Sequence, residues 1–230
     1  MRLVLESVRI ERGTWSLFAR GAFSSGVHLV TGVVGSGKST LALALAGLLH
    51  PASGTIRREG LVSSMISFQF PEYHITGFSV RKECRSWGLD PEFITAGIGL
   101  SEKMDTTPLQ LSRGELKRLH LACVLAGTYD LLILDEPFSS LDCCEKERVC
   151  EELSRKTGGI TLMFTHEQAI FPRVDYLWEI NGGELRCLGR VPDALSRWNH
   201  APELIKKLVS AGKIPENIAP HDLMEAACRT

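Results

Sequence analysis

A glycine-rich run at 32–40, Gly-Val-Val-Gly-Ser-Gly-Lys-Ser-Thr, carries the strongest chemical signal in this sequence. Its spacing, Gly-x4-Gly-Lys-Ser, is typical of a phosphate-binding loop, in which backbone N–H groups surround the phosphates of a nucleotide. Glycine is needed because the chain curls tightly and approaches the anion closely. The Lys38 ammonium would reach the β- and γ-phosphates, and the Ser39 hydroxyl would bind Mg²⁺. The expected nucleotide-binding residues are Gly32, Gly35, Ser36, Gly37, Lys38, Ser39 and Thr40.

The segments on either side place this loop between a strand and a helix. An apolar run at 27–30 predicts a strand, and the pattern at 38–48 predicts a helix. That helix would direct the partial positive charge of its N-terminus at the phosphates. A plain Gly/Ser-rich turn is the alternative, and the strand directly upstream argues against it.

A second group of candidate residues ends a mostly apolar run at 129–134. Such a run, stopped by Asp135, Glu136 and a proline, is typical of a fully buried parallel strand. Asp135 is placed to bind Mg²⁺, directly or through water, and Glu136 to polarise the water that attacks the γ-phosphate. Alone, the pattern predicts only a strand followed by a turn; the phosphate-binding loop upstream favours the functional interpretation.

Three further polar residues adjoin the ends of predicted elements. Ser112 precedes a helix predicted over 113–126, within the run Leu-Ser-Arg-Gly-Glu at 111–115. Because Ser-x-x-Glu is also a capping box, a purely structural role stays open for this run. Gln69 follows a strand predicted over 63–68, and His166 follows one over 159–164. A lone histidine at a strand end is usually structural.

The remaining pattern predicts an α/β fold. Strands alternate with helices, and buried parallel strands end in polar residues, which places the site at the carboxyl ends of the strands. Further strands are expected at 2–8, 14–19, 54–58, 174–180 and 184–188. Further helices are expected as two short segments within 78–98 and at 144–156, 192–198, 202–211 and 220–228.

The composition is that of an ordinary globular chain of 230 residues, with 44% hydrophobic and 23% charged residues. A net charge of −1 gives no electrostatic reason to expect nucleic acid as a partner. We expect no secretory signal and no membrane span, because no run approaches the ~18–20 apolar residues that a spanning helix needs. The seven cysteines have no paired spacing typical of zinc or redox sites, and we expect free thiols.

Taken in order, these segments resemble the motifs of the ATP-binding cassette (ABC) family over nearly the whole chain. Gln69 is similar to the Q-loop glutamine, 111–115 to the signature motif, 139–142 to the D-loop, and Thr165-His166 to the switch histidine. The resemblance implies an ATPase that uses ATP and Mg²⁺. It implies catalytic roles for Glu136, His166, Lys38 and Gln69, and Mg²⁺ ligation by Ser39, Gln69 and Asp135.

The resemblance also implies an architecture. A phosphate-loop nucleotidase core with a mainly parallel sheet, an N-terminal antiparallel subdomain and an inserted helical subdomain at about 72–127 would fill 1–190. A helical C-terminal extension at 191–230 would contact a second cassette, with a cap on the sheet edge as the alternative.

In the family, two cassettes dock head-to-tail, so Ser112 and Gly114 would act on the nucleotide of the other chain, identical or paralogous. Arg113 and Glu115 depart from the usual glycine and glutamine, which puts the strength of this site in doubt. The adenine-stacking position falls near Arg12, with Trp15 close by; the Arg12 guanidinium could stack on the base.

Segments 68–72, 75–80, 104–112 and 201–228 are similar to the energy-coupling-factor branch, which powers uptake of vitamins and of cobalt or nickel. This implies a subunit at the cytoplasmic face of the membrane that energises an importer. An integral membrane scaffold would contact Gln69–Val80, where the Glu72 carboxylate would accept a charge-assisted hydrogen bond from an arginine of the scaffold. The alternatives are another class of ABC transporter ATPase, a soluble nucleotide-controlled interaction protein, and a kinase with a phosphate-binding loop. The transported solute cannot be predicted.

Overall fold

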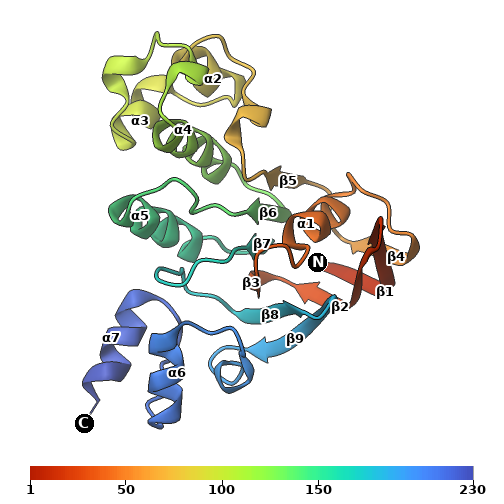
Figure 1. Ribbon diagram of the computed structural model, residues 1–230. Coiled ribbons are helices and arrows are strands. Elements are labelled where there is room, and N and C mark those ends of the chain that lie inside the picture. The colour runs from red at the N-terminus through yellow and green to blue at the C-terminus, as the bar shows by residue number, and fades with distance from the viewer. Residues whose placement is uncertain (230) are drawn as a thin grey trace.

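The computed structural model describes residues 1–229, and within them lies one nine-stranded sheet (Figure 1). Its strand order is β4-β1-β2-β9-β8-β3-β7-β6-β5. The strands are β1 (Arg2–Arg12), β2 (Trp15–Ser24), β3 (Gly26–Gly32), β4 (Ser53–Glu59), β5 (Ser64–Ser67), β6 (Leu131–Asp135), β7 (Ile160–Phe164), β8 (Tyr176–Asn181) and β9 (Glu184–Arg190).

The parallel part of the sheet consists of β5, β6, β7, β3 and β8. Every residue of β6 and β7 is buried, which explains their almost continuous apolar sequences. Asp135 pairs with Phe164, so both strands end at the same level. The carboxyl ends therefore form one edge, and the loop after β3 also lies there. This confirms the predicted α/β fold.

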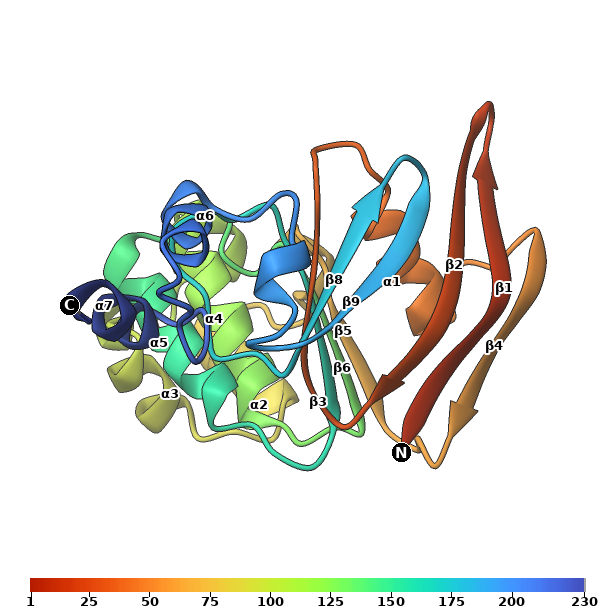
Figure 2. The ribbon, with the colours of Figure 1, turned by 90° about the horizontal axis from the view of Figure 1, so that it is seen from below.

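The N-terminal strands form an antiparallel arm in which β1 pairs with both β2 and β4. The arm joins the rest of the sheet through β2 and β9, which pair in parallel at Phe18 and Ala19. Figure 2 shows the arm curling back, with α1 (Lys38–Ala46) between it and the parallel strands. Leu41 and Leu45 of α1 pack there among buried side chains of both parts. The sheet is thus continuous, mixed and curled.

The opposite face of the parallel strands is covered by α4 (Arg113–Ala126) and α5 (Cys143–Ser154) (Figure 2). Leu121 and Val124 of α4 and Val149 and Leu153 of α5 belong to one core with Leu132, Leu134 and Met163 of the strands. The first half of α4 enters a second, smaller core with α2 (Val80–Ser86) and α3 (Pro91–Gly97). A short 3₁₀ turn, Pro71–His74, leads from β5 to α2, and two more, Ser101–Lys103 and Pro108–Gln110, lie between α3 and α4.

The C-terminal part packs on its own chain through α6 (Glu203–Ser210) and α7 (Pro220–Cys228). Trp198 donates from its indole nitrogen to the Thr31 hydroxyl at 2.9 Å, which ties this part to β3. The helix expected over 192–198 is a single 3₁₀ turn, Leu195–Arg197. The proposed contact of 191–230 with a second chain stays a prediction. No helix in residues 1–229 has the length and apolar character of a membrane span.

Candidate functional site

A pocket of about 390 Å³ opens at the carboxyl edge of the parallel strands. Its wall comes from four places in the sequence: the tip of the first hairpin, the glycine-rich loop, the segment after β5, and the ends of β6 and β7. It is lined by Arg12, Trp15, Val34, Gly35, Gly37, Lys38, Ser39, Thr40, Gln69, Glu136 and His166. Most of the residues selected from the sequence therefore meet around one space.

The glycine-rich loop has the backbone that its sequence predicts. Gly35 and Gly37 have φ values of +81° and +101°, which L-residues with a side chain rarely adopt. A Cβ atom on Gly37 would lie 2.2 Å from Cζ2 of Trp15, so the indole packs directly against the loop. The helix α1 begins at Lys38 and points its N-terminus into the pocket.

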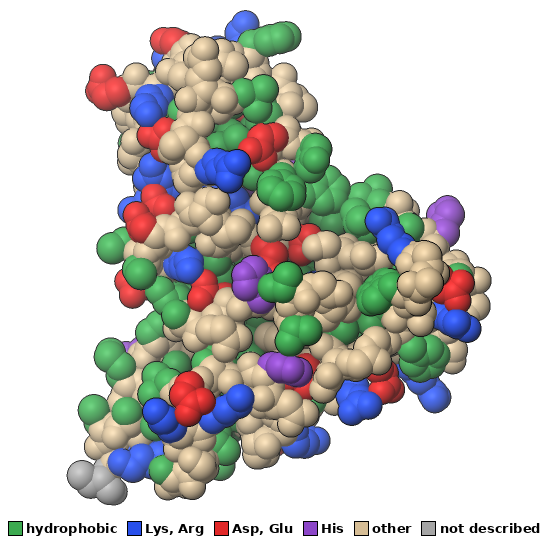
Figure 3. Space-filling view, in the orientation of Figure 1, with side chains coloured by type: hydrophobic (Ala, Val, Ile, Leu, Met, Phe, Trp, Pro, Cys, Tyr) green, Lys and Arg blue, Asp and Glu red, His purple; other side chains and the backbone are tan. Residues whose placement is uncertain are grey.

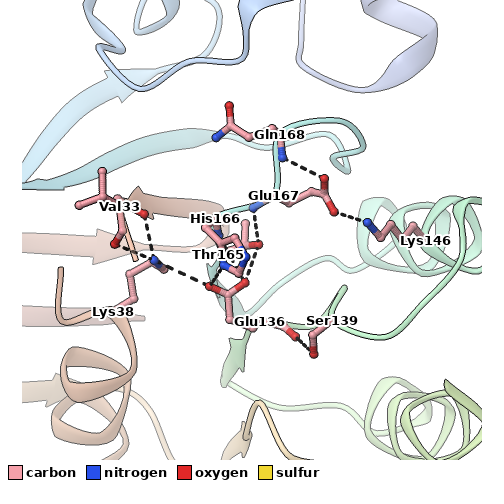
Figure 4. Close-up of polar contacts among 10 residues, drawn as sticks. Val33, Lys38, Glu136, Ser139, Lys146, Thr165, His166, Glu167 and Gln168 are labelled. Carbon is pink, nitrogen blue, oxygen red and sulfur yellow. Dashed lines mark hydrogen bonds and ion pairs between the residues drawn. The ribbon is translucent and has the colours of Figure 1, made fainter. Parts of the chain in front are cut away.

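Lys38 is 7% exposed and holds its ammonium inside the pocket. It donates to the carbonyls of Gly32 at 2.9 Å and Val33 at 3.2 Å, and lies 3.8 Å from Oε1 of Glu136 (Figure 4). Burial lowers the pKa of Lys38, and the carboxylates of Glu136 and Asp135 partly offset that effect. A buried cation at this point fits a phosphate ligand.

Asp135 is the last residue of β6, and Glu136 follows it directly. Asp135 is 6% exposed, and its Oδ1 is buried without a hydrogen-bond partner among the described residues. Burial raises the pKa of Asp135, while a hydrogen bond with Ser39 lowers it. An unpartnered carboxylate oxygen beside a serine hydroxyl is the kind of oxygen donor set that Mg²⁺ prefers. These two residues therefore fit the predicted metal ion.

Glu136 has a φ of +48°, an uncommon backbone for a residue with a side chain. Its N–H donates to the Phe164 carbonyl at 2.8 Å, which fixes the residue between two strands. The carboxylate accepts from the Thr165 hydroxyl at 3.0 Å and from Nδ1 of His166 at 2.7 Å (Figure 4). A carboxylate held in this way, with an exposed histidine beside it, can accept a proton from a water in the pocket.

Gln69 lines the pocket, and its backbone carbonyl accepts from the Lys117 ammonium at 3.2 Å. Lys117 is 1% exposed, and burial lowers its pKa to about 8, with partial compensation from Asp135, Glu136 and Glu72. Lys117 cannot be selected from the sequence, because a lysine in an amphipathic helix gives no signal of burial.

Arg12 and Trp15 border the pocket as the adenine prediction requires. Arg12 is exposed, whereas Trp15 is partly buried against Gly37. Which of the two contacts a base stays a prediction.

The signature residues lie outside this pocket, at the N-terminus of α4. Ser112 and Glu115 form a reciprocal capping box, so the structural interpretation of this run holds. Glu115 also pairs with Lys103 at 2.6 Å, and this contact is the main cause that lowers the pKa of Glu115 to about 2. Arg113 is exposed, and a Cβ on Gly114 would lie 2.9 Å from the Ser140 carbonyl. The structure thus presents this motif to solvent, next to the D-loop of the same chain.

The other selected residues have no contact with the pocket. Glu72 is exposed. All seven cysteines are free, three of them buried. Residues 1–229 contain no cluster of three or more His, Cys, Asp or Glu side chains that could hold a metal ion.

Comparison with known proteins places these motifs in a family. Residues 23–139 match the model described as ABC transporter. The chain is 34% identical over 166 residues to an ABC transporter ATP-binding protein of Methanosarcina mazei, which covers 61% of this chain and 33% of that protein. It therefore spans about a third of that relative. It is 30% identical over 189 residues to an energy-coupling factor transporter ATP-binding protein of Caldanaerobacter subterraneus, which covers 70% of this chain and 66% of that protein.

Two solved structures share the fold. A cobalt transport ATP-binding protein has a TM-score of 0.64 at 22% identity, over 80% of this chain and 78% of that one. A bacterial Atm1-family ABC exporter with ATP bound has a TM-score of 0.69 at 18% identity, over 92% of this chain and 42% of that one. At these identities the likeness shows the fold alone. Taken with the family match and the pocket, the chain belongs to the ABC transporter family, whose ATP-binding domains hydrolyse ATP to power transport.

Proposed function

We propose that this chain is the ATP-hydrolysing subunit of a membrane importer of the energy-coupling-factor type. The observation that carries the proposal is an incomplete site. Lys38 and Glu136 are buried in the wall of one pocket and Asp135 is buried next to Glu136 in the chain, whereas Ser112 is exposed and lies outside that pocket. The similarity to an energy-coupling factor ATP-binding protein supports the importer type.

Within this proposal the residues of the site fall into groups with different roles. The glycine-rich loop and Lys38 bind the phosphates of ATP, and Ser39, Gln69 and Asp135 hold Mg²⁺. The bound ion would neutralise phosphate charge during transfer. Glu136 orients the attacking water and accepts its proton, and His166 contacts the γ-phosphate.

The other half of the site comes from a second cassette chain. Ser112 and the backbone of Gly114 would donate hydrogen bonds to the partner's nucleotide, at a helix N-terminus that favours anions. The extra charge of Arg113 favours pairing with a paralogous chain over pairing with an identical one. Hydrolysis would remove the ligand that joins the two chains.

The membrane partner would dock on the helical side of the molecule. The segment Gln69–Val80 carries exposed aromatic side chains, with Tyr73 76% and Phe78 84% exposed, and Glu72 lies beside them. A groove of about 660 Å³ opens between α3, α4 and α5, lined by Phe93 and further apolar side chains together with Arg148, Arg155 and Lys156. Because three cations line this groove, the arginine contact is placed at Glu72 instead. A scaffold segment with an arginine for Glu72 and apolar side chains for the exposed aromatic rings would fit Gln69–Val80, at the cytoplasmic face of the membrane; Figure 3 shows hydrophobic side chains on the surface beside the helical part. The solute, a vitamin or a transition-metal ion, would never touch this chain.

The first experiment tests the chemistry. Glu136→Gln should keep ATP binding, lower turnover by roughly 10²–10⁴-fold, and accumulate a closed dimer with ATP and Mg²⁺. Glu151→Gln, an exposed change on α5, is the control. Retained turnover in Glu136→Gln would remove Glu136 from its role.

The second experiment tests the partner. Co-purification from membranes should recover an integral membrane protein, and Glu72→Arg should weaken that complex. Glu102→Arg, an equally exposed change in the helical part, should leave it intact. Recovery of only soluble proteins or nucleic acid would contradict the importer proposal.

A further inference from the structure

The loop that follows His166 is joined to α5 by an ion pair. Glu167 bonds through Oε2 to the ammonium of Lys146, and their side chains are only 13% and 20% exposed (Figure 4). Its other oxygen, Oε1, accepts from the N–H groups of Gln168 at 2.9 Å and Ala169 at 3.0 Å. One carboxylate thus closes the turn of the loop and anchors it to a helix.

The same loop reaches the Glu136 carboxylate through a hydroxyl. The N–H of Glu167 donates to the Thr165 hydroxyl at 3.0 Å, and that hydroxyl donates to Oε2 of Glu136 at 3.0 Å. Thr165 is 1% exposed, so its hydroxyl has no water to replace either bond. A continuous series of contacts therefore runs from Lys146 through Glu167 and Thr165 to Glu136.

Lys146 stands at a second functional segment, the D-loop. Its N–H donates to the carbonyl of Asp142 at 3.0 Å, in the first turn of α5. Asp142 ends the D-loop and caps this helix by accepting from the N–H of Glu145. The backbone of Lys146 thus holds the D-loop, while its side chain holds the switch loop.

We propose that Lys146 and Glu167 form a positioning pair that sets the orientation of His166 and Glu136 and makes it depend on the D-loop. The proposal rests on the proposed function, because it concerns the same hydrolysis. Neither residue lines the pocket, so neither is a catalytic residue. The pair fixes the geometry in which the water attacks the γ-phosphate, and small losses of alignment are costly to turnover.

The test compares Lys146→Met, Lys146→Arg and Glu167→Gln, alone and combined as Lys146→Met with Glu167→Gln. Lys146→Met should lower kcat on the order of tenfold, with ATP affinity and KM within about twofold of the unchanged protein. Lys146→Arg should recover most of kcat, since it restores the cation. The double variant should be no worse than Lys146→Met, because the two residues act as one unit.

Two controls separate positioning from stability. Glu151→Gln on the same helix changes an exposed charge and should leave kcat unchanged. Thr165→Val should lower kcat as Lys146→Met does, and Thr165→Ser should keep it, which tests the contacts independently if Lys146→Met folds poorly. Thermal unfolding of each variant reports its stability.

Three results would overturn the inference. They are a kcat within twofold in folded Lys146→Met, a Lys146→Arg as slow as Lys146→Met, and fully additive losses in the double variant. An unchanged protein that does not hydrolyse ATP with any partner would instead remove the proposed function itself. The two failures are therefore distinguishable.

Discussion

The pocket and the signature segment treat their polar groups in opposite ways. At the pocket, Lys38 and Glu136 of its wall and the adjacent Asp135 are each less than a tenth exposed, and the two carboxylates compensate the charge of the lysine. On α4, Ser112 and Arg113 face solvent. Burial of charge is costly and persists where the groups are paired or bind a ligand. The pocket is organised within one chain, whereas the signature segment leaves its polar side chains at the surface, as the proposed contact with a second chain requires.

The capping box sharpens this contrast. Ser112 accepts from the N–H of Glu115 at 3.3 Å, so the serine stabilises its own helix while its surface stays free. A structural role and a role toward a second chain are therefore compatible. ATP binding and ATP hydrolysis can therefore be tested separately for the pocket and for the signature segment.

The largest effect is expected for Ser112→Arg. It should lower hydrolysis by roughly 10²–10³-fold, because it removes a donor from the second half of the site and adds a bulky side chain. ATP affinity of the single chain should stay within about twofold. Steady-state hydrolysis and nucleotide titration check these two outcomes.

Asp90→Arg is the matched control, because Asp90 also caps a helix, α3, and lies outside both the pocket and Gln69–Val80. Loss of a helix cap costs about 1 kcal/mol at either position. If Ser112→Arg hydrolysed ATP normally, the site would be complete within one chain and the contrast would disappear.

Lys38→Ala should instead weaken ATP binding by the single chain. Loss of charge-assisted bonds to phosphate costs about 2–3 kcal/mol, roughly a hundredfold in affinity. Isothermal titration with ATP and Mg²⁺ measures it, with Lys206→Ala on the exposed face of α6 as the control. Equal affinities in the two variants would exclude Lys38 from phosphate binding.

Local sequence predicted the parts of the pocket that depend on local geometry. The helix predicted over 113–126 is confirmed as α4 with those bounds, since its apolar period and cap are both local. The strands ending at Asp135 and Phe164 can be predicted because fully buried strands leave continuous apolar runs. Parallel pairing then brings their ends together at the pocket.

Contacts between distant segments could not be predicted in this way. Nothing local to Lys117 indicates that it lies under the carbonyl of Gln69, and nothing local to Lys146 indicates Glu167 as its partner. Both lysines lie on helices whose polar positions are usually exposed. The helix expected over 192–198 became one 3₁₀ turn, where the Trp198 indole bonds to β3. Tertiary contacts decided these three cases.

Two substitutions in the glycine-rich loop, at Gly37 and Gly35, test how closely the loop packs against Trp15. Gly37→Ala combines a positive φ with a clash against Trp15, whereas Gly35→Ala has the same kind of φ with no atom within 4 Å of the new Cβ. Backbone strain costs about 1–2 kcal/mol in both, and overpacking adds about 1–3 kcal/mol in Gly37→Ala alone. Denaturant unfolding should therefore show a larger loss for Gly37→Ala. Equal losses would mean that the indole yields without cost.

The smallest effect concerns the strand that carries the loop. His28 of β3 is buried, accepts from the Trp178 indole at 3.0 Å and donates to the Ser24 carbonyl at 2.7 Å. Burial lowers the pKa of His28 from 6.5 to about 4, with smaller opposing contributions from Ser24 and Asp175. Between these pH values the unfolded chain binds a proton that the folded chain does not. The stability that depends on neutral His28 is therefore complete above pH 6.5 and is lost as the pH falls toward 4.

His28→Gln can make the same two hydrogen bonds without titrating. From pH 7.5 to pH 5, the unchanged protein should lose about 2 kcal/mol more of its free energy of unfolding than His28→Gln does. Urea unfolding at both pH values measures the difference, and shared titrations of other groups cancel. If both proteins lost the same free energy of unfolding, His28 would titrate alike in the folded and unfolded chain. The stability of β3 would then not depend on a neutral histidine. A clear difference would instead show that the pH sensitivity of the pocket comes from β3, the buried strand that carries the glycine-rich loop. The exposed N-terminus of α4 has no equivalent.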